Sequence, residues 1–223
     1  MAGGWDWGLI PFIRQTSDWT AFSTAAPWVF SAFGTHLLRL TPALVILAIF
    51  LVSGRKRGDF FLKKGNVSAP VEPSRLLGMK KPEPWTRIGS IFAVIFGTVT
   101  LIYLVASTSV SLASLTLALP LIPAALAIAA INAFNEEFTL RAAPLSGLSG
   151  TFSKQQALLM TSLFFGLGHF YGVPSGVLGV LLSSFLGWFL GKSMLETKGF
   201  TWAWFIHFLP DAFIFSFFAI AAV

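Results

Sequence analysis

The chain contains no cysteine and carries few charged residues. Without cysteine it cannot form a disulfide, a thiol nucleophile or a thiolate metal site. Only 11% of its 223 residues are charged, whereas soluble domains average about 25%, and this excludes an ordinary soluble protein. A disordered chain needs low hydrophobicity and high net charge. That class is excluded as well, because 55% of the residues are hydrophobic.

Long apolar segments dominate what the chain does contain. Its 24 phenylalanines and 8 tryptophans suit a protein that faces lipid and is anchored at membrane interfaces. A membrane-spanning helix needs about 20 mostly apolar residues. We therefore predict an all-α, polytopic membrane bundle of about six helices, with residues 1–33 along the interface. The six predicted spans are 34–53, 88–106, 111–134, 156–172, 174–191 and 200–222.

Most basic residues lie in one stretch between predicted spans. The loop 54–87 holds nine of the fifteen lysines and arginines, and its four prolines prevent a long helix there. If this loop is cytoplasmic, alternation of the spans places 135–155 and 192–199 on the same side, and thirteen of the fifteen basic residues are then cytoplasmic. Nucleic-acid binding is not predicted, because no aromatic residues interleave the basic ones.

Three short patterns place ionisable groups within apolar segments, where they are costly and indicate function. The first is Asn-Glu-Glu-Phe-Thr-Leu-Arg at 135–141. Glu137 and Arg141 are four residues apart, acid before base, which favours an ion pair on a helix. Glu136 points about 100° away from this pair and is left available. The alternative is a charged helix end at the cytoplasmic interface.

The other two patterns contain the histidines. Phe-Gly-Leu-Gly-His at 165–169 lies in an apolar segment, where its glycines permit close helix approach. In His-Phe-Leu-Pro-Asp at 207–211, the spacing of four places His207 and Asp211 on one helix face. A structural role is the alternative for each histidine. Together, however, the groups can be satisfied only by meeting inside the bundle, where they are suited to activate water and stabilise an oxyanion.

The three patterns, taken in order, resemble the motifs of the CPBP family of CAAX proteases and bacteriocin-processing enzymes, also called the ABI family. They are Glu-Glu-x-x-x-Arg, Phe-x-x-x-His and His-x-x-x-Asp. Members of the family include the type II CAAX prenyl endopeptidases, which are glutamic-type intramembrane proteases. The resemblance covers about residues 130–215, so we divide the single membrane domain into an N-terminal part, 1–110, and a catalytic core, 111–223.

The resemblance implies a role for each residue of the three patterns. Glu136 is the general base that activates water, His169 assists it, and His207 with Asp211 stabilises the oxyanion. The supporting residues are Glu137, Arg141 and Phe165. Many family members have Asn at the last position of the third pattern. An ionised Asp only accepts hydrogen bonds, so Asp211 must either be protonated or orient a protonated His207.

The predicted spans conflict with this site in one respect. Glu136 lies at the inner end of the third span, while His169 lies about 13 residues into the fourth, roughly 20 Å along it. Straight helices cannot bring them together. We therefore expect residues 138–158 to form a re-entrant or interfacial segment, with a displaced or kinked fourth span. His207, about 9 residues from Lys198, is expected roughly 13 Å deep, in a polar cavity open to the cytoplasmic side.

Two other protease classes are less well supported. Two short runs resemble rhomboid serine-protease motifs: Gly-Leu-Ser-Gly at 147–150 and His-Phe-Tyr-Gly at 169–172. Rhomboid proteases separate the serine and the histidine by two spans, whereas these runs lie on one hairpin segment. Ser149 instead suits a turn. The second class is the metalloproteases, whose usual zinc-binding helix carries the motif His-Glu-x-x-His. This motif is absent from the sequence. We predict no cofactor, with a divalent metal held by the histidines, Glu136 and Asp211 as the alternative.

The main non-enzymatic alternative is a membrane scaffold, immunity protein or transporter, since intramembrane charges also suit ion pathways. The clustered site and the absence of an internal repeat favour an enzyme. The expected substrate is a membrane-associated protein or peptide: a prenylated CAAX peptide, a leader peptide or a C-terminal sorting signal. Small size and short loops favour a prokaryotic inner membrane. His36 and Arg39 are interpreted as residues that extend to the outer interface.

Overall fold

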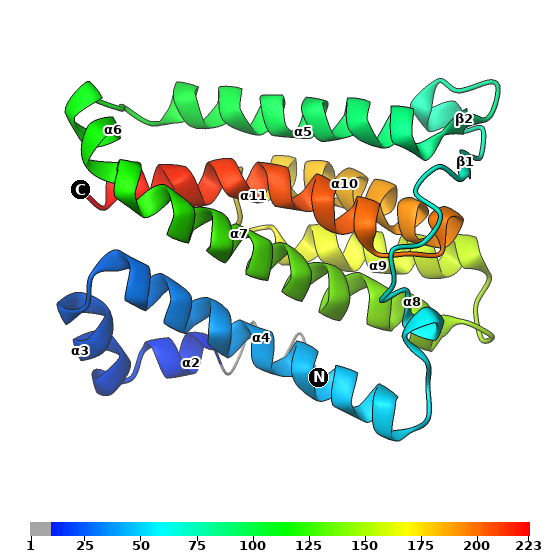
Figure 1. Ribbon diagram of the computed structural model, residues 1–223, viewed down its shortest axis with the longest axis horizontal. Helices are drawn as coiled ribbons and strands as arrows, with labels where there is room; N and C mark the ends of the chain where they lie inside the picture. Colours follow the sequence, from blue (N-terminus) through cyan, green and yellow to red (C-terminus); the bar gives the residue numbers. More distant parts are fainter. Residues whose placement is uncertain (1–9) are drawn as a thin grey trace. The chain divides into compact units, whose positions relative to one another are not determined.

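The computed structural model describes residues 10–223, and nearly all of its elements are helical (Figure 1). One pair of two-residue antiparallel strands joins Pro70 to Pro84 and Val71 to Glu83. The elements are α2 (Ile10–Arg14), α3 (Ser17–Ala25), α4 (Trp28–Val52), η2 (Arg57–Phe60), β1 (Pro70–Val71), η3 (Arg75–Leu77), β2 (Glu83–Pro84), α5 (Trp85–Ser107), α6 (Leu112–Ala118), η4 (Leu119–Leu121), α7 (Ile122–Glu137), η5 (Phe138–Ala142), α8 (Ala143–Leu148), α9 (Lys154–Gly168), α10 (Gly176–Thr197) and α11 (Thr201–Ala221).

Five helical stretches of the described chain are long and apolar enough to cross a membrane. They are α4, α5, the run Leu112–Leu148, α10 and α11. The predicted all-α, multi-pass membrane fold is confirmed. The predicted fourth span, 156–172, corresponds to α9, which at 15 residues is shorter than any of these five. Of the expected interfacial segment 1–33, Trp5 and Trp7 lie outside the described residues, and α2 and α3 occupy the part before α4.

The third predicted span ends later than expected. Helix α7 continues through η5, a π-helical turn, into α8, so the helix reaches Leu148 rather than residue 134. Pro144 gives a physical reason for the π-helical turn, because in a regular α-helix its ring would crowd the Leu140 carbonyl. The segment 138–158, which we expected to be re-entrant or interfacial, is helical over its first half, followed by a short turn and the start of α9.

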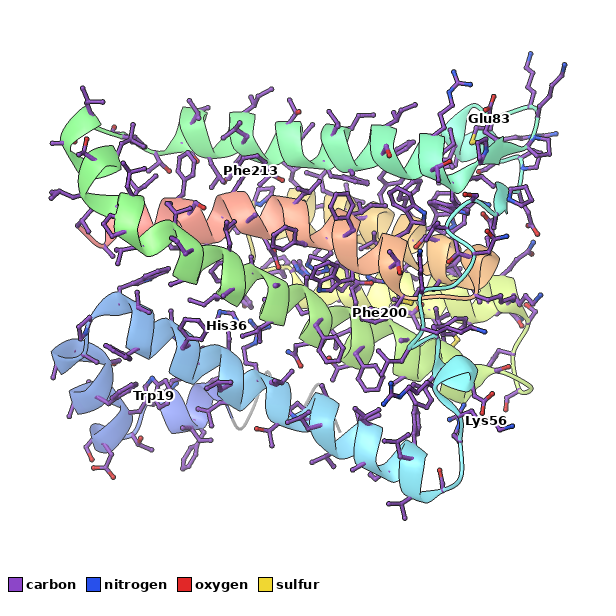
Figure 2. All side chains as sticks on the ribbon, viewed as in Figure 1. Trp19, His36, Lys56, Glu83, Phe200 and Phe213 are labelled. Atoms are coloured by element: carbon purple, nitrogen blue, oxygen red, sulfur yellow. The ribbon has the colours of Figure 1, made fainter. Side chains whose placement is uncertain are left out.

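The described chain forms two compact units, each assembled from separate segments. The first unit comprises 1–47, 95–135 and 208–223. Small side chains of α7 and α11 form its buried core with Ile128 and Phe215. His36 of α4 (Figure 2) is also buried and packs its ring edge-on against Phe215, with the ring centroids 4.8 Å apart. His36 is therefore a core residue of this unit, contrary to the expected position at the outer interface.

The second unit comprises 48–94 and 136–207. Its helices α9 and α10 pack along each other (Figure 1). A Cβ atom at Gly166 would lie only 2.7 Å from the Val180 carbonyl oxygen and would collide with the Ser184 side chain. Glycine at this position is what permits the close approach of the two helices. Helix α9 begins with a capping box between Ser153 and Gln156, which satisfies its first backbone N–H groups.

The basic loop 54–87 is folded rather than open. Its backbone bonds the turn between α10 and α11: Asn66 N donates to Thr197 O at 2.8 Å, and Phe200 N donates to Lys63 O at 2.8 Å. Gly65, with a φ of +72°, makes the contact possible, since a Cβ there would lie 2.6 Å from the Gly199 Cα. The prolines that prevent a helix therefore do not prevent an ordered, specific structure.

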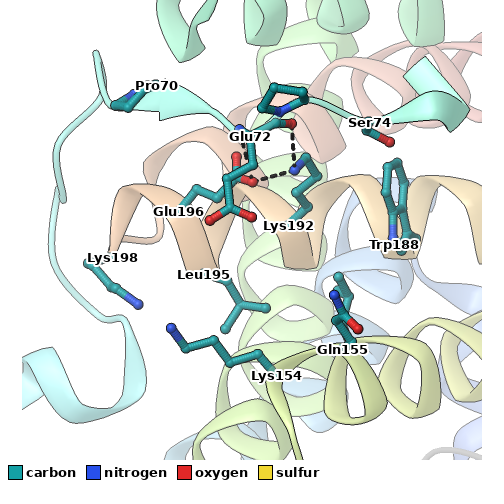
Figure 3. A pocket seen from close by; sticks show the side chains of 12 residues that line it. Pro70, Glu72, Ser74, Lys154, Gln155, Trp188, Lys192, Leu195, Glu196 and Lys198 are labelled. Carbon is teal, nitrogen blue, oxygen red and sulfur yellow. Dashed lines mark hydrogen bonds and ion pairs between the residues drawn. The ribbon is translucent and has the colours of Figure 1, made fainter. Parts of the chain in front are cut away.

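A largely buried ion pair of α10 anchors the same loop. Lys192 pairs with Glu196, and its Nζ donates to the Glu72 carbonyl at 3.1 Å. Glu196 accepts in turn from the Glu72 backbone N–H at 3.3 Å and from the Trp85 indole N–H at 2.8 Å. Figure 3 shows the bonds among Glu72, Lys192 and Glu196 beside a pocket of about 480 Å³, into which the exposed Lys154 also extends.

We expect Glu196→Leu to release this loop while leaving the membrane helices folded. The change removes the acceptor for two N–H groups and the partner of Lys192. A loss of about 1.4 kcal/mol raises the population of the open loop tenfold. Limited trypsin digestion in detergent should therefore cleave within 54–87 at least about tenfold faster. Gln155→Ala, an exposed position that lines the same pocket, is the control. Digestion of Glu196→Leu at the wild-type rate would mean that the ion pair does not hold the loop.

Candidate active site

The structure brings Glu136, His169 and His207 together within the second unit. The Glu136 Oε2 atom lies 3.8 Å from His169 Nε2 and 3.6 Å from His207 Nε2. Glu136 and His207 are buried, whereas His169 is half-buried. A carboxylate thus faces two imidazoles at distances slightly longer than a direct hydrogen bond.

The continuous α7–η5–α8 run explains how these groups meet. Glu136 lies about three turns before this run ends at Leu148, and His169 lies about four turns after α9 begins at Lys154. The chain reverses direction between α8 and α9, so Glu136 and His169 lie at similar distances from this turn. The conflict in the predicted spans arose because the third span was ended at residue 134, next to its charged residues.

His169 is oriented by its own helix. Its Nδ1 lies 2.8 Å from the Phe165 carbonyl oxygen. A carbonyl only accepts, so Nδ1 carries the proton and donates this bond. In the neutral ring, Nε2 then has the lone pair, and it faces Glu136. The histidine therefore presents an acceptor to the space beside the carboxylate.

Glu137 orients the second histidine. Its Oε1 lies 2.7 Å from His207 Nδ1, and the same oxygen pairs with Arg141. The ion pair predicted from the helical spacing is present, and both side chains are completely buried rather than at an interface. The contact between Glu137 and His207 was not predicted, because their separation of 70 residues leaves no local signal.

Phe165 packs against Arg141 and against both histidines. Arg141 Nε donates to the Gly187 carbonyl at 3.1 Å, and its guanidinium lies 4.5 Å from the centre of the Phe165 ring. The Phe165 ring centroid is 4.3 Å from that of His169 and 5.7 Å from that of His207. Phe165 therefore fixes the spacing of both imidazoles.

Asp211 belongs to the first unit, one helical turn beyond His207 on α11. Its Oδ2 accepts a hydrogen bond of 2.9 Å from the Asn132 amide of α7, and the Asn132 oxygen accepts one of 3.1 Å from Arg39 of α4. Arg39 is thus directed to Asn132, contrary to the expectation that it extends to the outer interface. Sequence analysis missed Asn132. The available signal was an amide four residues before Glu136 in an apolar helix.

The serine-protease and metal alternatives can be compared with this geometry. Ser149 lies in the turn before α9, and His169 lies at the far end of that helix, roughly 20 Å away along it. A serine–histidine pair of these residues is therefore not formed. Among residues 10–223, no group of three or more His, Asp or Glu side chains is placed to hold a metal ion.

Comparison with known proteins supports the motif assignment. Residues 118–213, less than half of the chain, match the family model described as Type II CAAX prenyl endopeptidase Rce1-like. No curated protein and no solved structure matches the chain. The matched segment contains all three patterns, so the resemblance predicted from them is confirmed. The segment that carries Glu136, His169 and His207 is similar to the Rce1-like type II CAAX prenyl endopeptidases.

Proposed function

We propose that this protein is an intramembrane endopeptidase of the glutamic type. It hydrolyses a peptide bond near the membrane surface with water activated by Glu136 and His169. The observation that carries this proposal is the buried Glu136 carboxylate facing His169 Nε2 and His207 Nε2 at 3.8 and 3.6 Å. The similarity of residues 118–213 to an endopeptidase family supports it.

The two acceptors define the first step. A water molecule between Glu136 and His169 donates one hydrogen bond to each, which directs its oxygen lone pair toward the substrate. Glu136 takes a proton from this water as the oxygen bonds to the peptide carbonyl carbon. The carbonyl π electrons move onto the carbonyl oxygen. When the tetrahedral intermediate collapses, the C–N bond breaks and the proton held by Glu136 passes to the leaving amine.

His207 and Asp211 stabilise the oxyanion in this proposal. His207 Nδ1 is engaged with Glu137, so a protonated ring presents Nε2–H to the substrate as a donor. Arg141 pairs with the same Glu137 oxygen that bonds His207 Nδ1, and so holds this acceptor in place. This arrangement gives the two adjacent glutamates different roles, with Glu136 in the chemistry and Glu137 in support.

The proposed substrate is a membrane-associated peptide. A prenylated C-terminal CAAX peptide is the first candidate, because the matching family model describes prenyl endopeptidases. A leader peptide and a C-terminal sorting signal are the other candidates. We place the protein in a prokaryotic inner membrane with the basic loop 54–87 in the cytoplasm, so the scissile bond is approached from the cytoplasmic side.

A cleavage assay with product identification tests this function. The purified protein in detergent is incubated with prenylated and unprenylated CAAX peptides and with a membrane-peptide library, and products are identified by mass spectrometry. We expect cleavage that persists in a chelator and in Ser149→Ala. Activity abolished by the chelator would favour the metal-dependent alternative. The absence of cleavage by folded wild-type protein would favour a scaffold or immunity protein.

A further inference from the structure

The pocket of about 480 Å³ in the second unit contains none of the candidate catalytic residues (Figure 3). Its walls are the basic loop 54–87, the first turns of α9 and the last three turns of α10. Helix α10 has 22 residues and is about 33 Å long, close to the thickness of the hydrocarbon core. The pocket at the end of this helix therefore lies at the level of the phospholipid headgroups.

Two lysines bring uncompensated positive charge to this pocket. Lys154 begins α9 and Lys198 follows α10, and both side chains are exposed. Figure 3 shows them extending toward each other. Within residues 10–223, neither ammonium group forms a hydrogen bond or an ion pair. Lys192 differs from them, because it is only 7% exposed and its charge is balanced by Glu196.

The charges around the pocket are positive in sum. Outside the ion pair of α10, the lining contains one acid, the exposed Glu72. A second hollow shares Lys198 with the pocket and adds the exposed Lys63 and Lys64. With Lys154, four exposed lysines face one opposing carboxylate. Clusters of lysines at this level of a membrane attract anionic lipid headgroups.

The deeper end of the pocket is apolar. Leu158 lies one turn after Lys154 on α9, and Trp188 lies one turn before Lys192 on α10. The two helices pack along each other in opposite directions, so Leu158 and Trp188 are each about 6 Å closer to the middle of the membrane than these lysines. A soluble anion has no group that suits this end. A phospholipid suits both ends, with its phosphate beside the lysines and its first acyl carbons beside the apolar residues.

We propose that this pocket binds the phosphate headgroup of an anionic phospholipid, and that Lys154 and Lys198 contact the phosphate. Lys192 has a structural part, since its bonds to Glu196 and to the Glu72 carbonyl hold the loop wall of the pocket in place. A bound headgroup joins α9, the end of α10 and the loop 54–87, so it stabilises the folded protein. The site is separate from Glu136 and the histidines, and the proposal is independent of the proteolytic reaction.

Thermal unfolding of the delipidated full-length protein in detergent tests this proposal. The probes are dioleoyl phosphatidylglycerol, phosphatidylcholine with the same acyl chains, glycerol 3-phosphate and inorganic phosphate. A ligand that binds only the folded state raises the unfolding temperature according to its concentration and Kd. We expect a saturable increase with phosphatidylglycerol and no increase with the other three at the same concentrations. Native mass spectrometry of the same samples counts the bound lipids directly.

Two double variants locate the binding site. Lys154→Gln with Lys198→Gln should unfold as wild type does without lipid, because both side chains are exposed and form no bond within the described chain. Its apparent Kd for phosphatidylglycerol should be at least about tenfold weaker. Lys80→Gln with Lys81→Gln is the matched control. It removes the same charge from exposed positions of the same loop that line neither hollow, and it should bind phosphatidylglycerol as wild type does.

Several results would overturn the proposal. Equal stabilisation by phosphatidylcholine would mean that the charge of the headgroup is not recognised. Wild-type affinity in the Lys154 and Lys198 double variant would place the lipid elsewhere on the protein. Stabilisation by inorganic phosphate or glycerol 3-phosphate, lost in the same variant, would make the pocket a site for a soluble phosphate instead. The absence of both stabilisation and bound phosphatidylglycerol would exclude a lipid site in this pocket.

Discussion

Glu136→Gln is expected to abolish cleavage while leaving the protein folded. Gln is nearly isosteric with Glu but cannot take a proton from water, so the general base is lost. General acid–base catalysis contributes roughly 10²–10⁴-fold to rate, and here the same group also delivers the proton to the leaving amine. We therefore expect kcat to fall by at least about 10³-fold, measured by product formation in detergent, with an unchanged unfolding temperature.

The adjacent glutamate provides the matched control. Glu137→Gln makes the same chemical change one residue away, but Glu137 pairs with Arg141 and bonds His207 rather than facing the two Nε2 atoms. It should lower the unfolding temperature more than Glu136→Gln and reduce kcat less. Equal cleavage by Glu136→Gln and wild type would exclude Glu136 as the base. A larger loss of kcat in Glu137→Gln than in Glu136→Gln would make Glu137 the base and Glu136 the supporting residue.

Apolar segment length was enough to predict the membrane fold, because burying backbone in lipid permits little besides helices. It also located the helices that carry the three patterns. The position where the third helix ends could not be predicted this way. Any rule based on hydropathy places the charged residues 136, 137 and 141 at a membrane interface. In the structure, however, Glu137 and Arg141 are 0% exposed and neutralise each other. A charge buried by its partner has the same sequence signature as a charge at the surface.

The sequence predicted the ionisable residues of the candidate site but not the neutral polar residue beside them. Glu136, His169 and His207 attract attention in apolar segments because an unpaired charge there is costly. Asn132 carries no charge, so the amide that bonds Asp211 gave a weak signal. Arg39 did give a signal, but its partner lies 93 residues away, and one sequence contains no information on such a pairing. The folded loop 54–87 was missed for a similar reason, since its contacts are mainly through backbone groups.

Arg141→Met should have the largest effect on stability of the changes considered. It removes the cation from a completely buried pair and leaves the Glu137 carboxylate without its arginine partner, although the bond to His207 remains. Breaking a buried ion pair by removing one partner costs about 3–5 kcal/mol, because the remaining charge is uncompensated. Loss of the Arg141 partner also releases from its ion pair the Glu137 oxygen that bonds His207. Cleavage should therefore fall together with the unfolding temperature.

The chain contains an exposed pair with the same residues and spacing. Glu83 and Arg87 are also Glu and Arg at i and i+4, 3.1 Å apart, but their side chains are 37% and 65% exposed. An exposed pair of this kind contributes only about 0.3–0.5 kcal/mol, so Arg87→Met should unfold nearly as wild type does. Reversible unfolding of both variants in detergent measures the difference. Similar stability of Arg141→Met and Arg87→Met would mean that the buried pair is not needed for folding. The position of His207 would then have to be maintained by Phe165 and the packing of α11, rather than by the charge on Glu137.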